Sequence, residues 1–334
     1  MIKNFNKAVD LINKSKSLLI TSHTRPDGDA VGCMKAFYDT ATLLGKKAQP
    51  LLLSPLAKWY EFIFQKPIPV LGNDVKIEDL QNGSFGSFDL IVIVDTNSYV
   101  QLTEFDKWLK VSKIPVLVID HHLTGDGLGT VEVVDSTAAA TGEIIFDLLK
   151  FAKWEITPDI AQALYVAIAT DTGWFRFDNT DSRVMRNASS LIEFGASPTT
   201  IYRKLYQNYS TSRLKLLGVM LNNLEFHRNG QIAIQHIMRS DFDATGATGS
   251  DTEEFVNECQ RVSIVKCAAL FVELKDGGFR CSLRSDGSVD VQQIASELGG
   301  GGHKLASGVN LKGNLAEVKK LILDRFEQQL SSKD

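Results

Sequence analysis

The sequence is poor in cysteine and has no long apolar run, and both shortages exclude classes of protein. Its 334 residues include four cysteines, none of which belongs to a CxxC pair. A zinc site built on paired cysteines and a disulfide framework are therefore not expected, and a reducing cytoplasm fits. No apolar stretch approaches the roughly 18 residues needed to cross a bilayer, and residues 1–20 have the apolar spacing of a helix rather than of a signal peptide. We predict a cytoplasmic protein with no membrane partner.

The sequence also has no excess of basic residues. Lysine and arginine total 36 against 40 acidic residues, which gives a formal net charge of −4. Proteins that coat long nucleic acids bind the phosphate backbone through many basic side chains. We therefore expect no long duplex nucleic acid as a partner, whereas small anionic substrates remain compatible with positive charge that is concentrated locally.

Apolar residues, by contrast, are abundant and periodic. They make up 44% of the chain, and its length predicts two domains at roughly 150 residues per domain. Helical patterns alternate with apolar runs rich in β-branched residues, at 17–22, 88–95 and 115–120 and more weakly at 48–54. This alternation predicts an α/β domain whose parallel sheet is covered by helices on both faces.

The second half of the sequence has a different pattern. From about Thr157 the chain is helical, and two strand patterns then meet at a Lys-Asp-Gly-Gly turn at 275–278, which is typical of a hairpin. The sequence therefore predicts an α/β domain at 1–190, a helical linker at 191–227 and a smaller α+β domain at 228–334.

Acidic and imidazole side chains follow the predicted strands. The carboxyl ends of strands in an open parallel sheet line the ligand crevice, so these side chains are expected to meet. A further aspartate ends a long apolar helical pattern, where an unpaired buried charge is costly. An ordinary solvated turn is the alternative for residues 23–32, because Pro-Asp-Gly is common turn chemistry. The candidates are His23, Asp27, Asp29, Asp95, Asp120, His121, His122 and Asp171.

This set of donors indicates metal chemistry. Carboxylates with imidazoles and no thiolate suit two divalent first-row ions, with Mn²⁺ favoured and Mg²⁺, Co²⁺ or Fe²⁺ as competitors. A mononuclear zinc hydrolase needs only three protein ligands, which is fewer than the candidates present.

Four segments, in chain order, resemble the motifs of the DHH phosphoesterase family. They are HTRPDGDAVG at 23–32, VDTNS at 94–98, IDHH at 119–122 and TDTGWFRF at 170–177. Residues 279–308, FRCSLRSDGSVDVQQIASELGGGGHKLASG, resemble the family's associated C-terminal substrate-binding domain. In its length and in its Gly-Gly-Gly-Gly-His segment, the chain most resembles the family's group of bifunctional oligoribonucleases and 3′-phosphoadenosine-5′-phosphate phosphatases. Cys33 is a small departure, because a serine is common there.

The resemblance implies a division of roles among the candidates. His23, Asp27 and Asp95 would hold one metal ion, and Asp29, Asp95, His121 and Asp171 would hold the other, so that Asp95 bridges them. A hydroxide formed between the ions would attack phosphorus, and His122 would donate to the scissile phosphate. Asp120 either orients an imidazole or simply caps its strand, and both interpretations stay open.

The resemblance also implies substrate contacts in the C-terminal domain. Glycines let successive backbone N–H groups converge on a phosphate, with Lys304 as a further donor, although a flexible linker is the alternative. Arg176 and Arg183 are weaker candidates, and we interpret both as ordinary surface arginines. Residues 136–143, STAAATGE, are interpreted mainly as a helix N-terminus packed by small residues. The predicted substrate-binding residues are Arg284, Ser285, Gly300, Gly301, Gly302 and His303.

The expected activity is hydrolysis of short oligoribonucleotides to 5′-mononucleotides, and of 3′-phosphoadenosine-5′-phosphate to AMP. Partners would be short RNA or small nucleotides, and a homodimer is left open. Cleavage of cyclic dinucleotides or their linear products is the alternative. A pyrophosphatase is disfavoured because the basic Ser-Arg-Lys-Lys segment of that relative is missing. A long-strand exonuclease is disfavoured because the sequence has no sign of a basic channel. An inactive nucleotide sensor is disfavoured because the set of candidate ligands is intact.

Overall fold

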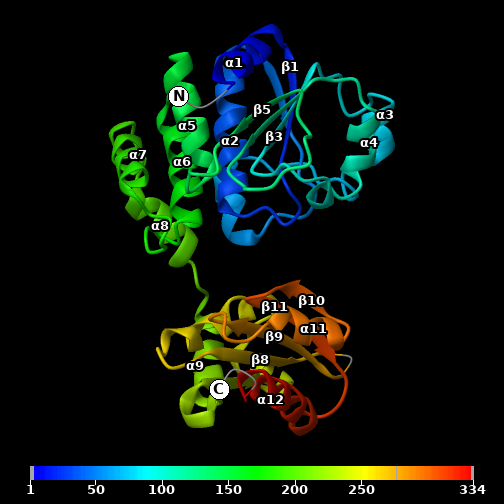
Figure 1. Ribbon diagram of the computed structural model, residues 1–334, viewed down its shortest axis with the longest axis vertical. Coiled ribbons are helices and arrows are strands. Elements are labelled where there is room, and N and C mark those ends of the chain that lie inside the picture. The colour runs from blue at the N-terminus through cyan, green and yellow to red at the C-terminus, as the bar shows by residue number, and fades with distance from the viewer. Residues whose placement is uncertain (1–3, 276, 332–334) are drawn as a thin grey trace. The chain divides into compact units, whose positions relative to one another are not determined.

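The computed structural model describes residues 4–275 and 277–331, so one residue of the predicted hairpin turn lies outside it. The chain divides into two compact units, Met1–Asn208 and Tyr209–Asp334 (Figure 1). The first unit contains α1 (Phe5–Lys14), β1 (Ser17–Thr21), α2 (Gly28–Leu43), β2 (Lys47–Pro50), η1 (Lys58–Ile63), α3 (Ile77–Gln81), β3 (Leu90–Val94), η2 (Tyr99–Leu102), α4 (Phe105–Val111), β4 (Val116–Asp120), β5 (Val131–Val134), α5 (Thr141–Ala152), α6 (Pro158–Asp171), α7 (Ser182–Glu193) and α8 (Pro198–Tyr206).

The first unit is built on a five-stranded parallel sheet. Its strand order is β2-β1-β3-β4-β5, and every neighbouring pair is parallel. The strands β3 and β4 are buried along their whole length, as expected for a sheet covered on both sides. Helices α1, α2 and α5 pack on one face, with α6 against α2 and α5, and α3 and α4 pack on the other face (Figure 1). The predicted architecture is confirmed, although β5 at the edge was not anticipated.

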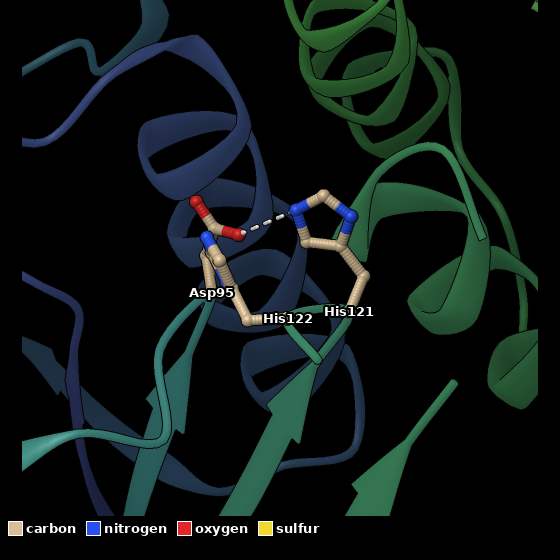
Figure 2. A group of neighbouring side chains, drawn as sticks. All are labelled: Asp95, His121 and His122. Carbon is tan, nitrogen blue, oxygen red and sulfur yellow. Dashed lines mark ion pairs between the residues drawn. The ribbon is translucent and has the colours of Figure 1, made fainter. Parts of the chain in front are cut away.

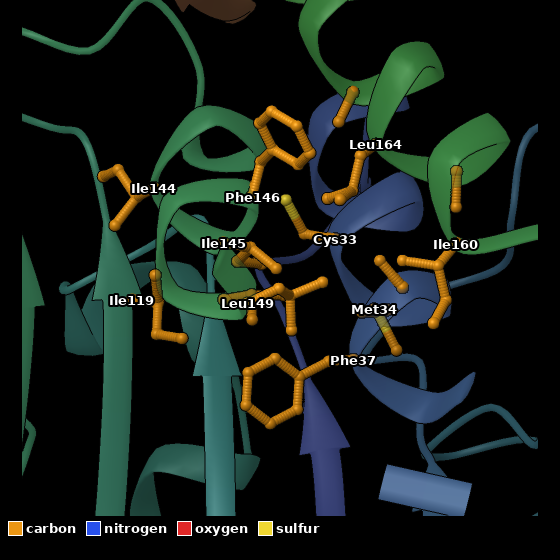
Figure 3. Packing of buried hydrophobic residues seen from close by; sticks show 14 of the residues in the cluster. Cys33, Met34, Phe37, Ile119, Ile144, Ile145, Phe146, Leu149, Ile160 and Leu164 are labelled. Atoms are coloured by element: carbon orange, nitrogen blue, oxygen red, sulfur yellow. The ribbon is translucent and has the colours of Figure 1, made fainter. Parts of the chain in front are cut away.

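The helices over the first face pack closely, as Figure 3 shows for α2, α5 and α6. Two glycines one turn apart on α2 allow its contact with α6. A Cβ at Gly28 would lie 2.3 Å from Thr170 Oγ1, and one at Gly32 would lie 2.5 Å from the carbonyl oxygen of Ala163. Because α2 and α6 also carry candidate ligands, this contact sets the distance between them.

Replacing Gly32 with alanine should therefore destabilise the fold. The new methyl group meets a backbone oxygen that cannot rotate away, so we expect a loss of roughly 1–3 kcal/mol in the free energy of unfolding. Gly218→Ala is the matched control, because it lies in a helix with nothing within 4 Å of its Cβ position. That variant should gain about 0.5–1 kcal/mol. Urea unfolding of both variants measures the contrast, and equal stability of the two would contradict the packing argument.

The second unit is α+β, as predicted. Its six-stranded sheet has the order β10-β11-β9-β8-β7-β6, in which β7 and β8 are parallel and the other pairs antiparallel. Helices α11 and α12 pack on one face, and α9, α10 and η5 on the other. Its elements are α9 (Thr211–Asn222), β6 (Glu225–His227), η3 (Arg228–Gly230), β7 (Ile232–Ile237), α10 (Arg239–Thr245), η4 (Gly249–Thr252), η5 (Phe255–Arg261), β8 (Cys267–Glu273), β9 (Phe279–Ser285), α11 (Val291–Glu297), β10 (Gly301–His303), β11 (Ala306–Leu311) and α12 (Leu315–Ser331).

The helices of the predicted linker belong to both units. Helix α8 packs against α6 and η1 in the first unit, whereas α9 packs against α10 and β7 in the second. The boundaries 1–190, 191–227 and 228–334 stay a prediction. Among the helices that the structure describes, none has the length and apolar character to cross a membrane.

Candidate active site

Three strands of the parallel sheet deliver candidate ligands to the same edge. His23 follows β1, Asp95 follows β3, and His121 follows β4. The Nε2 atom of His23 lies 3.4 Å from Asp95 Oδ2, and that of His121 lies 3.6 Å from Asp95 Oδ1. Figure 2 shows Asp95 beside His121, with His122 next to them. Asp171 reaches the same place from the end of α6, with Oδ2 3.3 Å from His121 Nε2.

The two aspartates after β1 have different environments. Asp27 is exposed and caps α2, because its Oδ1 accepts hydrogen bonds from the backbone N–H groups of Asp29 and Ala30. It also lies 4.0 Å from His23 Nε2. Asp29 is buried and accepts from the backbone N–H groups of Thr141 at 2.6 Å and Gly142 at 3.0 Å. The N-terminus of α5 therefore holds this carboxylate, as a helix N-terminus favours an anion.

Thr141 is a site residue that the sequence reasoning missed. Its hydroxyl donates to Asp95 Oδ1 at 3.0 Å while its backbone N–H donates to Asp29, so one residue orients two carboxylates. Gly142 is needed beside it, because a Cβ there would meet Ala167 Cβ at 2.6 Å. The available signal was the STAAATGE segment, which was interpreted mainly as a helix N-terminus packed by small residues and not as part of the site.

The carboxylates of this cluster repel each other. Burial, followed by the charges of neighbouring aspartates, raises the pKa of Asp29 and that of Asp95 well above the ordinary range. Burial and Asp29 raise the pKa of Asp171 to about 7. Asp95 also has a backbone φ of 61°, which is a left-handed conformation that a non-glycine residue rarely adopts. Strain and anion crowding at one residue mark it as functional.

His122 is held by Asp120 at the end of β4. Its Nδ1 lies 2.7 Å from Asp120 Oδ1, and the backbone N–H of His121 donates to the same oxygen. The hydrogen bond with Asp120 raises the pKa of His122 above its usual value. Asp120 is fully buried, and its Oδ2 has no hydrogen-bond partner among the described residues. The half-exposed His122 ring therefore has a fixed orientation and a free Nε2.

The side chains can be grouped by the distances between their donor atoms. Ligand atoms within 4.8 Å of one another are provided by His23, Asp27 and Asp95, by Asp29, His121 and Asp171, and by Asp95, His121 and His122. The first two groups use all six predicted metal ligands and share none. Oxygen and imidazole nitrogen donors of this kind suit divalent first-row ions. The structure thus brings all six predicted ligands together.

The second unit places two predicted substrate-binding residues in one row. In the strand pairing, His303 of β10 lies opposite Ala306 of β11, which in turn lies opposite Arg284 of β9. Residues paired across strands share a face of the sheet, so His303 and Arg284 point to the same side with a small residue between them. Arg284 Nε donates to Asn257 Oδ1 at 2.8 Å, and burial lowers its pKa. His303 is exposed.

The other predicted substrate-binding residues lie elsewhere on this sheet. Ser285 is buried on the opposite face from Arg284, and its Oγ accepts from the backbone N–H groups of Gly287 and Val289, both at 3.0 Å. The glycine segment does not form an irregular loop. Gly301 and Gly302 belong to the short strand β10, and Gly300 donates its backbone N–H to Ala295 O at 2.7 Å.

The two weaker arginine candidates are held by other groups of the first unit. Arg183 forms ion pairs with Asp135 at 2.8 Å and Asp147 at 2.9 Å. Arg176 is exposed and donates from Nε to the carbonyl oxygen of Gly173 at 2.7 Å. Arg183 therefore has a structural role, in agreement with its interpretation as an ordinary arginine.

Comparison with known proteins defines the family. Residues 17–168 match the DHH family, N-terminal domain, and residues 229–332 match the DHHA1 domain. The chain belongs to the DHH family. The bifunctional oligoribonuclease and PAP phosphatase NrnA of Thermus thermophilus is 31% identical over 322 residues, which cover 94% of this chain and 90% of that relative.

Two further relatives span nearly the same length. The bifunctional oligoribonuclease and PAP phosphatase NrnA of Bacillus subtilis is 26% identical, with coverage of 88% of this chain and 89% of the relative. The crystal structure of an exopolyphosphatase-related protein from Bacteroides fragilis has a TM-score of 0.85 at 25% identity, with coverage of 98% and 96% of the two chains. The similarity therefore extends over both units.

Proposed function

We propose that this chain is a metal-dependent phosphoesterase. It hydrolyses short oligoribonucleotides to 5′-mononucleotides and 3′-phosphoadenosine-5′-phosphate to AMP. The observation that carries the proposal is the convergence of four aspartates and two histidines, in two separate ligand groups, at the carboxyl edge of the parallel sheet. The activities named for the relatives from Thermus thermophilus and Bacillus subtilis agree with this chemistry.

The donor set fits two divalent cations. Burial and mutual repulsion raise the pKa values of Asp29, Asp95 and Asp171, so the ionised cluster needs positive charge to be stable. His23, Asp27 and Asp95 would hold one ion, and Asp29, Asp95, His121 and Asp171 the other, with Mn²⁺ favoured. Two such ions, when bound, would activate water and offset the charge of the phosphate.

The protein orients the two histidines among the candidate metal ligands through a hydrogen bond to the ring nitrogen that would not bind the metal. His23 Nδ1 lies 2.9 Å from Thr24 O and His121 Nδ1 lies 3.2 Å from Ala138 O, which leaves both Nε2 atoms facing Asp95. An imidazole that donates Nδ1–H to a carbonyl group presents Nε2 as a lone-pair donor. The hydroxyl group of Thr141 donates a hydrogen bond to Asp95 Oδ1 and so fixes the orientation of that carboxylate.

His122 has a different task, which is to donate a hydrogen bond to the scissile phosphate. Its Nδ1 is occupied by Asp120, so its free Nε2–H is available to the substrate. The neighbouring carboxylate favours the protonated ring, which is the form that donates from both nitrogens. Asp120 acts as a positioning residue.

The row formed by His303, Ala306 and Arg284 would bind a phosphate or sugar group of the substrate. An exposed imidazole and a guanidinium on one face supply donors for phosphate or sugar oxygens, and Ala306 leaves room between them. Such a row is too short for a long strand. This geometry favours substrates of a few nucleotides.

A substrate panel tests the proposal. We expect the highest kcat/KM for RNAs of roughly two to five nucleotides and a fall for longer RNA, because few groups track a strand. His303→Ala should lose most of the activity on a dinucleotide but much less on bis-p-nitrophenyl phosphate, which needs only the metal centre. Asn310→Ala, a change of an exposed residue on β11, is the control. Equal losses on both substrates, or preference for a long RNA or a cyclic dinucleotide, would contradict it.

A further inference from the structure

Arg25 lies inside the loop that carries the first candidate ligands, and the reasoning above leaves it without a task. It is two residues from His23 and two from Asp27, so its Cα lies no more than about 7 Å from either Cα. The side chain is exposed, and its guanidinium forms no hydrogen bond or ion pair with any residue that the structure describes. Among the described residues Asp27 forms no ion pair with Arg25, and Asp27 Oδ1 accepts the two hydrogen bonds that cap α2.

The backbone at Arg25 is strained and clamped. Its φ is 53°, a left-handed value that a non-glycine residue rarely adopts, and the following residue is Pro26, which restricts it further. The backbone N–H of Arg25 donates to Ser54 Oγ at 2.6 Å, and that of Thr24 donates to Gln101 O at 2.9 Å. A conformation that costs energy and is fixed from two sides is a marker of a functional position.

The charge of the bound substrate explains why a free cation is needed there. The five aspartates of the cluster, when ionised, carry one negative charge more than two divalent cations can offset; a protonated His122 would balance that charge, but a phosphate ester adds at least one more. Arg183 is occupied by Asp135 and Asp147, and Arg176 donates Nε to a carbonyl group. Two arginines lie in the segments that carry the candidate ligands, Arg25 in 23–32 and Arg176 in 170–177. Of these two, only the guanidinium of Arg25 has no hydrogen-bond partner among the described residues. The five aspartates are Asp27, Asp29, Asp95, Asp120 and Asp171.

We propose that Arg25 binds a non-bridging oxygen of the phosphate under attack. The inference rests on the proposed phosphoesterase function and adds a substrate-binding residue to it. Arg25 follows β1 and is bonded through its backbone to Ser54, which follows β2, whereas His122 follows β4. Arg25 and His122 therefore lie on opposite sides of Asp95 in the strand order. The guanidinium fork suits a tetrahedral phosphate.

Arg25→Asn provides the test. Asparagine adopts a left-handed backbone more readily than arginine, so the variant should fold with at least wild-type stability while losing the cation. We expect kcat/KM to fall roughly 100-fold on a dinucleotide and on bis-p-nitrophenyl phosphate alike, as for loss of one transition-state donor. Bound metal should stay at the wild-type level. Binding of AMP to the Mn²⁺-loaded protein, measured by calorimetry, should weaken about tenfold or more. Arg25→Lys should recover part of both losses.

Lys107→Gln is the matched control, since it removes one positive charge from an exposed position of α4. It should leave AMP binding and hydrolysis unchanged. Wild-type AMP binding and kcat/KM in Arg25→Asn would overturn the proposal, and so would a loss of bound metal from that variant. A wild-type protein that hydrolyses no phosphate ester would instead refute the proposed function, so the two failures are distinguishable.

Discussion

Asp95→Asn is expected to lower kcat for every phosphate ester by roughly three orders of magnitude or more, because a carboxylate shared by two metal ions supplies several kcal/mol of charge stabilisation. Asp95 lies within 3.6 Å of the Nε2 atoms of both His23 and His121, and it accepts a hydrogen bond from Thr141. The variant should also bind less metal, as measured by elemental analysis after dialysis. Near-normal Mn²⁺-dependent hydrolysis would contradict the shared-ligand assignment.

The stability of the same variant separates loss of function from loss of fold. Burial raises the pKa of Asp95, so the folded metal-free protein disfavours its ionised form and loses stability as the pH rises above the ordinary carboxyl range. Asparagine carries no charge and escapes this cost. We expect the melting temperature of the metal-free variant to be at least that of the wild type at neutral pH, and to respond less to added Mn²⁺. A lower melting temperature would mean that the carboxylate is mainly structural.

His122→Ala is expected to lower kcat by roughly 100-fold or more while the protein keeps its metal. The physical reason is that His122 donates to the phosphate from Nε2, with Nδ1 held by Asp120 at 2.7 Å. Asp120→Asn should cause a smaller loss of about tenfold to 100-fold, since it leaves the imidazole in place but weakens its orientation. Measuring kcat and metal content on the same samples checks both expectations.

One outcome would reverse the role given to His122. Asp95, His121 and His122 also bring their ligand atoms within 4.8 Å of one another. If His122→Ala loses about one equivalent of metal, this third group is the true ligand set and His122 is not a donor to phosphate.

The positions of the candidate metal ligands could be predicted because they depend on a simple regularity. Parallel strands end at one edge of a sheet, so polar residues after β1, β3 and β4 must meet there. His23, Asp95 and His121 lie as this rule requires. Asp171 was predictable for another reason, since a charge at the end of an apolar helix needs a partner.

The supporting contacts could not be predicted, because they depend on tertiary packing. Asp29 accepts a hydrogen bond from the backbone N–H group of Thr141, 112 residues away, so the small residues around Thr141 indicate a helix N-terminus but not which carboxylate it binds. The alignment of His303 with Arg284 depends on the register of three strands. Ser285 was predicted to bind substrate because it follows Arg284 in the sequence. Successive residues of a strand face opposite sides of the sheet, and the Ser285 hydroxyl instead accepts hydrogen bonds from the backbone of the following turn.

The most direct test of the account is hydrolysis of a 5′-phosphorylated RNA dinucleotide by the wild-type protein stripped of metal with a chelator and then reconstituted. The account predicts no mononucleotide release from the stripped protein and full release after addition of Mn²⁺, with chromatography as the readout. Undiminished hydrolysis in the presence of the chelator would contradict it, as would failure to cleave the dinucleotide with Mn²⁺, Mg²⁺, Co²⁺ or Fe²⁺.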